Sequence, residues 1–243
     1  MLACSPSAFA AAVDAHPFNY FAFGDESLAR AATSVAEAGL VVVGEPHGVR
    51  ETPSVLYALA SALRTRAVAF EWSHEEMDQP VRDFLHSGSF DFEWLWALPP
   101  SAEFFCGDGR IAAGHFALLR RLREEGRLDQ VIVYDRLDPE PPEDWQVREK
   151  DMADRLLSEW DRAVPLVALT GAFHAQMHLG SESMTARLCS VRPRLLPAML
   201  DYAKGYCWSR GELHDVSGAM PEAPIRLEVP QATPAVVPGR PES

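Results

Sequence analysis

The pattern Gly-x-x-His occurs twice in this chain, each time directly after a short apolar run. His47 ends the first copy (Gly-Glu-Pro-His, 44–47) and His174 ends the second (Gly-Ala-Phe-His, 171–174). A histidine placed by a glycine turn after a buried strand lies at the carboxyl edge of a sheet, where open α/β sheets bind ligands. Two such turns predict that two imidazoles share one crevice.

Acidic and basic residues accompany these turns. Glu45 lies two residues before His47, and a carboxylate beside a histidine orients the ring and stabilises its protonated form, which makes His47 a candidate general base. Glu71 follows an apolar run, where desolvation would raise its pKa or an arginine would pair with it. Arg148, on an expected helix, is a candidate for binding a carboxylate or an oxyanion. The alternative reading of these residues is a capped turn, a structural salt bridge and a solvated helix face.

Four further residues are predicted to bind substrate. Arg50 falls on the first turn of the helix expected after His47, and Asp135 and Arg136 follow a third apolar run. His115 lies within an apolar helix and would face the crevice if that helix packs over it. A histidine satisfied within the core is the alternative for His115.

Several catalytic templates are missing from the sequence. It contains no G-x-S-x-G, Walker, G-x-G-x-x-G or H-E-x-x-H pattern, so covalent catalysis by serine has little support. Water activated by a histidine or by a metal is the simpler chemistry. A histidine mechanism needs no cofactor. A divalent metal or haem is the open alternative, because histidines and carboxylates also ligate iron, manganese and zinc; the metal ligands would then be Glu45, His47 and His174.

The apolar runs alternate with amphipathic segments along the chain. The segments at 40–43, 67–70, 130–134 and 166–169, which are apolar apart from Gln130, are typical of strands buried on both faces, with later strands expected at 194–199 and 225–229. This alternation predicts an α/β fold, with a mostly parallel central sheet flanked by helices on both faces. We expect one domain over residues 1–229, an aromatic-rich insert at 87–107 that forms a lid, and a disordered tail at 230–243.

The bulk composition limits the classes of partner. The chain has 243 residues, is 47% hydrophobic and 23% charged, and carries a formal net charge of -13. This acidity disfavours nucleic acid, and no apolar run is long enough to span a membrane, so we expect a small-molecule substrate. The four cysteines form no C-x-x-C pair, which favours a reducing, cytoplasmic location.

Taken together, these residues resemble the superfamily that joins erythromycin esterases, ChaN-type haem-binding proteins and Tiki metallopeptidases. The resemblance spans roughly residues 40–180 and rests on five features: Gly44 to Gly48, Arg50-Glu51, Glu71 after its strand, Arg148 to Met152, and Gly171 to His174. One spacing departs from the esterases, which resemble Gly-Glu-x-x-His. Here only Pro46 separates Glu45 from His47, a spacing that is closer to the haem-binding and Tiki branches.

The esterase branch of this resemblance implies water attack on an ester or lactone. On that basis His47 would activate water, Glu45 and Glu71 would orient it or share its proton, and His174 and Arg148 would bind the developing oxyanion. An amide substrate is also compatible. The ChaN and Tiki branches imply instead a haem- or metal-binding protein, and a third alternative is a binding module that kept the fold without the chemistry.

Overall fold

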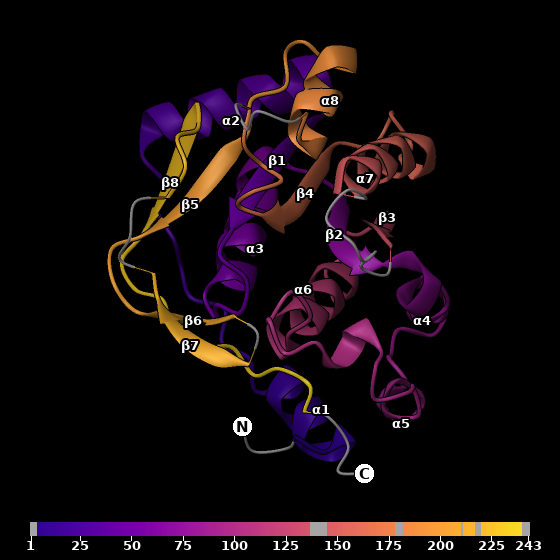
Figure 1. Ribbon diagram of the computed structural model, residues 1–243. Coiled ribbons are helices and arrows are strands. Elements are labelled where there is room, and N and C mark those ends of the chain that lie inside the picture. Colours follow the sequence, from indigo (N-terminus) through magenta and orange to yellow (C-terminus); the bar gives the residue numbers. More distant parts are fainter. Residues whose placement is uncertain (1–3, 137–144, 178–181, 210, 217–219, 240–243) are drawn as a thin grey trace.

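The computed structural model describes residues 4–136, 145–177, 182–209, 211–216 and 220–239 (Figure 1). Its core is a six-stranded sheet in the order β3-β2-β4-β1-β5-β8, and neighbouring strands pair in parallel. The strands are β1 (Leu40–Glu45), β2 (Ala67–Ser73), β3 (Gln130–Asp135), β4 (Leu166–Gly171), β5 (Ala198–Tyr202) and β8 (Ile225–Val229). The predicted α/β class with a parallel sheet is confirmed.

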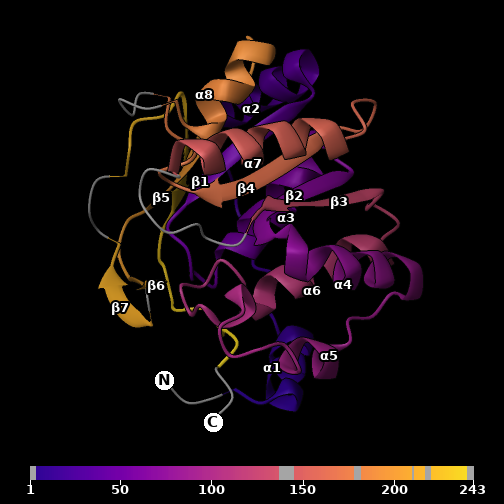
Figure 2. The same cartoon turned by 45° about the vertical axis from the view of Figure 1, so that its right-hand side comes forward.

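Helices cover both faces of the sheet. Figure 2 shows α7 (Trp145–Glu159) and α8 (Met184–Val191) on one side, with α3 (Thr52–Leu63) and α6 (Ala113–Glu124) on the other. The remaining long helices are α1 (Pro6–Asp14), which packs on α6, α2 (Asp25–Ala38), which packs on β1 and β8, and α4 (His74–Ser87), which packs on β2 and β3. The polar ends of β1, β2 and β4 emerge between these two layers.

The burial of β1 explains its unbroken apolar sequence. Successive side chains of a strand point to opposite faces. Val41 and Val43 lie in the core under α3 and α6, whereas Leu40 and Val42 lie in the core under α7 and α8. All four are fully buried. A strand covered on both faces needs apolar residues at every position.

The aromatic-rich insert at 87–107 is packed against the N-terminal helix. It contains α5 (Phe92–Trp96) and a 3-10 turn, η1 (Glu103–Phe105). The Phe9 ring of α1 lies 5.4 Å from Phe92 and 5.6 Å from Phe116 of α6, both edge-on. Aromatic clustering therefore fixes the insert, and its role as a lid stays a prediction.

The structure differs from the expected disorder of the tail over residues 230–239. The Arg50 N–H donates to the Thr233 carbonyl at 2.8 Å, and the Ala235 N–H donates to the Gly48 carbonyl at 2.9 Å. Proline and alanine dominate this stretch, yet its backbone is hydrogen-bonded to the turn that follows β1. The last four residues lie outside the described part of the chain.

One local expectation also changes, because the strand expected at 194–199 begins only at Ala198. An antiparallel hairpin of β6 (Tyr206–Ser209) and β7 (Glu212–Asp215) was not predicted.

All four cysteines are free thiols. Within the described ranges, no helix is both long enough and apolar enough to cross a bilayer.

Two glycines bring the turn that carries His47 against the loop before α6. Gly48 (φ +76°) and Gly109 (φ +85°) lie so close that a Cβ on Gly109 would be 2.1 Å from the Gly48 Cα. Substitution of Gly109 is therefore unfavourable for two reasons: the added Cβ would clash with the Gly48 backbone, and L-residues disfavour a positive φ.

We expect Gly109→Ala to lower the free energy of unfolding by roughly 2–4 kcal/mol, because left-handed strain adds to a clash with backbone. Gly126→Ala is the matched control, since Gly126 also has a positive φ (+64°) but nothing within 4 Å of its added Cβ. Urea denaturation measures both variants. Equal losses would show that the close contact contributes nothing.

Candidate functional site

The carboxylate of Glu71 lies at the centre of a buried cluster at the carboxyl edge of the sheet. Glu71 is 3% exposed. Its Oε2 accepts hydrogen bonds from the Thr170 hydroxyl at 2.7 Å and from the Gly171 backbone N–H at 2.6 Å. Its Oε1 lies 3.3 Å from His174 Nε2 and 3.7 Å from His47 Nε2. The two histidines of the repeated pattern therefore meet on one carboxylate.

His47 is held between two carboxylates by the turn after β1. Its Nδ1 lies 3.3 Å from Glu45 Oε1, while its Nε2 faces Glu71. Gly171 leaves the room for this ring, because a Cβ there would be 2.8 Å from Nε2. The His47 side chain is 18% exposed, against 1% for Glu45 and 3% for Glu71. His47 is thus the member of this group most open to a ligand.

His174 is fixed on both ring nitrogens. Its Nδ1 lies 2.6 Å from Glu149 Oε1, and its Nε2 faces Glu71. Glu149 also accepts a hydrogen bond from the Met184 backbone N–H at the start of α8. The Trp145 ring stacks on His174 with a centroid distance of 5.0 Å and an interplanar angle of 23°. These contacts give the imidazole one orientation.

Two arginines, Arg148 and Arg110, form ion pairs with Glu71. Arg148 on α7 donates from Nη2 to Glu71 at 3.2 Å and from Nε to Asp135 at 3.0 Å. Arg110, in the loop before α6, lies 3.2 Å from Asp135 and 3.8 Å from Glu71. Asp135, predicted to bind substrate, is fully buried and holds both guanidinium groups. Arg148 and Asp135 therefore lie in position to orient Glu71.

The charges of the cluster shift the pKa of its members in opposite directions. Burial alone would raise the pKa of Glu71, but His174 and His47 outweigh it and hold that pKa well below its ordinary value. Burial alone would lower the pKa of each histidine, but Glu71, with Glu45 or Glu149, raises the pKa of His47 to about 10 and that of His174 to about 9. These raised pKa values favour the protonated form of both imidazoles at neutral pH.

His115 does not join the cluster's hydrogen bonds. It is 1% exposed, and its ring lies 5.4 Å from Phe70 and 6.1 Å from Trp72. Neither ring nitrogen has a hydrogen-bond partner among the described residues. Burial and the charge of His47 lower its pKa to about 3, so the ring is neutral. The structure thus places His115 in the core, as the alternative expected, but without the satisfied nitrogens that this alternative included.

The other two predicted substrate-binding residues lie on separate pockets. Arg50 is exposed and lines a pocket of about 150 Å³ with His16 and Gly114. Arg136 pairs with Asp151 at 2.8 Å on the rim of another pocket, beside α7. Neither arginine contacts Glu71 through any interaction found in the described residues.

Three members of the cluster were missed by sequence reasoning. Glu149 is adjacent to Arg148 in a charged run that reads as a solvated helix face, and Trp145 begins the same helix. Arg110 follows a Gly-Asp-Gly loop outside any regular element. The one sequence signal that could have found Glu149 is its position next to Arg148, on a helix that was expected to turn one face towards the sheet.

The described residues contain no group of three or more His, Cys, Asp or Glu side chains arranged to hold a metal ion. Glu45, His47 and His174 were the metal ligands expected if a metal is bound. In the structure, both ring nitrogens of His174 face carboxylates, so neither is free to bind a metal ion. This arrangement does not fit a metal ligand set, and a role for haem stays a prediction.

Comparisons with known proteins relate the chain to others by fold alone. No family model and no curated protein matches it. The crystal structure of a Bacillus cereus protein superposes with a TM-score of 0.63 at 8% identity, over 96% of this chain and 99% of that one. A structure described as bacterial protein toxins gives 0.50 at 14% identity, over 72% of this chain and 38% of that one. RRSP, a MARTX toxin effector domain from Vibrio vulnificus, gives 0.49 at 16% identity, over 73% and 36%. None of the three is named as an erythromycin esterase, a ChaN-type protein or a Tiki protein.

We expect Glu71→Gln to lower the pKa of both His47 and His174, by about 1 to 3, because the amide keeps the shape but removes the charge that stabilises the imidazolium ions. Histidine NMR titration measures both values. Glu75→Gln is the control, since Glu75 faces only His74, at 3.6 Å, among the ion pairs of the described residues. Unchanged titrations of His47 and His174 in Glu71→Gln would contradict the assigned geometry.

Proposed function

We propose that the cluster is the active site of an esterase-like hydrolase, in which His47 accepts a proton from water that attacks an ester or lactone. The observation that carries this proposal is the environment of His47 Nε2. At 3.7 Å from Glu71 it is beyond hydrogen-bond distance, and its side chain is partly exposed. Once the ring has lost its Nε2 proton, this nitrogen is an acceptor with no hydrogen-bond partner among the described residues, so a water molecule can donate to it.

The carboxylates around His47 give it the properties of a general base. Glu45, at Nδ1, favours the tautomer with its proton on that nitrogen, which leaves the Nε2 lone pair for water. As water loses its proton to Nε2 and attacks the carbonyl carbon, the ring becomes an imidazolium beside Glu71. The buried negative charge of Glu71 stabilises that product of the proton transfer. Collapse of the tetrahedral intermediate returns the proton to the leaving oxygen.

The roles of His174 and Arg148 change in this mechanism. Both nitrogens of His174 already face carboxylates, and Arg148 is bonded to Glu71 and Asp135. We therefore assign them as positioning residues for Glu71, rather than as direct ligands of the oxyanion. The positive charge of protonated His174 still lies at the site and favours a developing oxyanion through the local field.

Aromatic rings at the rim favour an apolar acyl or lactone group. Trp145, stacked on His174, is 38% exposed, and Phe173, the preceding residue, is 66% exposed. Large apolar side chains exposed beside a polar cluster are typical of ligand sites. We accordingly propose a small-molecule substrate, neither nucleic acid nor membrane, and membership of the superfamily that the sequence resembles. Cytoplasmic location is part of the same proposal.

We expect His47→Ala to lower kcat/KM for p-nitrophenyl butyrate or a simple lactone by about 100-fold to 10,000-fold, because a positioned general base contributes that much. His214→Gln is the control, since His214 is exposed on the β6–β7 hairpin. Spectrophotometric and pH-stat assays measure the two activities. Undiminished turnover in His47→Ala would remove His47 as the base.

The raised pKa of His47 sets the pH dependence. Only unprotonated His47 accepts a proton from water, so kcat/KM should rise about tenfold per pH unit until it levels near the His47 pKa of about 10. Glu71→Gln should move this rise to lower pH. Circular dichroism at each pH controls for unfolding, because protons bound with raised pKa values stabilise the fold and that stabilisation declines from about pH 6.5 upwards. A rate that falls with pH over this range would instead identify the imidazolium as an acid.

A further inference from the structure

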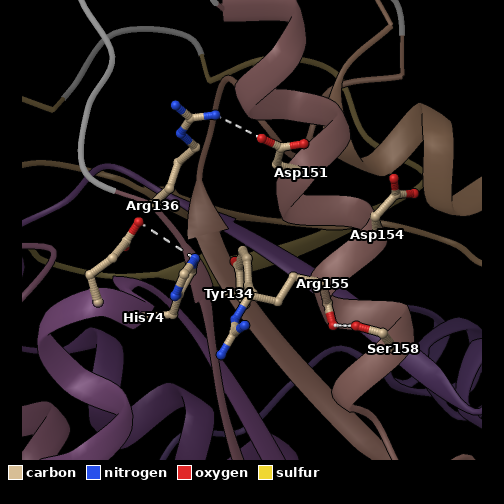
Figure 3. Close-up of a pocket in the computed structure, with 8 residues that line it drawn as sticks. His74, Tyr134, Arg136, Asp151, Asp154, Arg155 and Ser158 are labelled. Atoms are coloured by element: carbon tan, nitrogen blue, oxygen red, sulfur yellow. Dashed lines mark hydrogen bonds and ion pairs between the residues drawn. The ribbon is translucent and has the colours of Figure 1, made fainter.

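A second polar pocket lies at the same edge of the sheet, between the start of α4, the end of β3 and α7. Its volume is about 420 Å³, within the range of small-molecule sites. Figure 3 shows Arg136 and Asp151 bonded at one rim, with Arg155 and Ser158 further along α7 and His74 on the α4 side of the pocket. Nothing in the hydrolytic mechanism uses these side chains.

The arginines of this pocket are already paired and anchored. Arg136 donates to Asp151 at 2.8 Å. Arg155 donates to Asp78 at 2.6 Å and, through Nε, to the Val133 carbonyl at 3.0 Å. A guanidinium group has more N–H donors than these bonds use, and each carboxylate has more lone pairs. The side chains that line the pocket therefore present oriented hydrogen-bond donors and acceptors side by side.

The distribution of charge selects the kind of ligand that this wall fits. A free anion in the pocket would lie against Asp151, Asp154 and Glu75, and a free cation would lie against Arg136 and Arg155. Either one would therefore lie against side chains of its own charge, which disfavours both relative to a neutral group. A hydroxyl group donates to a carboxylate and accepts from a guanidinium at the same time, so neighbouring hydroxyls can use each pair without separating it.

We propose that this pocket binds a neutral, polyhydroxylated ligand. Its position also connects it to the active site. Arg136 directly follows Asp135, which holds Arg148 behind Glu71, and Asp151 lies on the helix that carries Trp145. If the proposed hydrolysis is correct, the pocket is a recognition subsite for a hydroxylated part of the same substrate.

Isothermal titration calorimetry on the full chain tests this assignment with D-glucose, D-sorbitol, glycine and inorganic phosphate as separate probes. We expect one or both of the neutral polyols to bind with a Kd on the order of 1 mM. Asp151→Asn, which keeps the shape but removes the charged acceptor, should weaken binding about tenfold or more. Asp129→Asn is the matched control, because Asp129 is also in an ion pair with an arginine (Arg66) and is 41% exposed, against 43% for Asp151.

The outcomes separate this proposal from the hydrolytic one. Polyol binding that persists in His47→Ala and is lost in Asp151→Asn supports the pocket, even if no ester is hydrolysed. Binding of phosphate or glycine alone, binding of none of the probes, or polyol binding that Asp151→Asn leaves unchanged would overturn it. A preference between D-glucose and D-sorbitol distinguishes a sugar ring from an open-chain polyol.

Discussion

The burial of one ionised carboxylate is the constraint on which this site depends. A lone charge taken out of water is very costly, and it is retained only where it is paired and hydrogen-bonded. Glu71 meets that condition through two donors from β4, two imidazoles and two guanidinium groups. These partners come from β4 and the turn after it, the turn after β1, the loop before α6, and α7, so the carboxylate is satisfied only when all of these segments are in place.

The parallel sheet is what brings these partners together, and that much could be predicted from the sequence. Apolar runs that end in Glu45, Glu71 and Gly171 indicate strands buried on both faces, and the carboxyl ends of parallel strands meet at one edge. The convergence of His47 and His174 followed from this rule without any knowledge of strand order. The observed order places β4 between β1 and β2, which is why both histidines reach the same oxygen of Glu71.

Contacts made by irregular segments could not be predicted in the same way. Arg110 lies in an irregular loop, and its approach to Glu71 goes together with an ion pair to Glu103 of the aromatic insert. Glu149 looks like a solvent-facing charge until the rotation of α7 is known. The tail is rich in proline and alanine, yet it pairs through backbone atoms, whose bonding does not depend on residue type. Sequence periodicity reports buried faces and carries little information on such backbone or loop contacts.

The link from Glu149 to the first N–H of α8 has a consequence for synthesis of the protein. The carboxylate that orients His174 is itself fixed by Met184, which lies more than a hundred residues after Glu71. A nascent chain on the ribosome therefore cannot complete this cluster until most of its length has been translated and has left the exit tunnel. Shorter chains lack the Met184 donor to Glu149, so the final orientation of His174 has to wait for the synthesis and folding of α8.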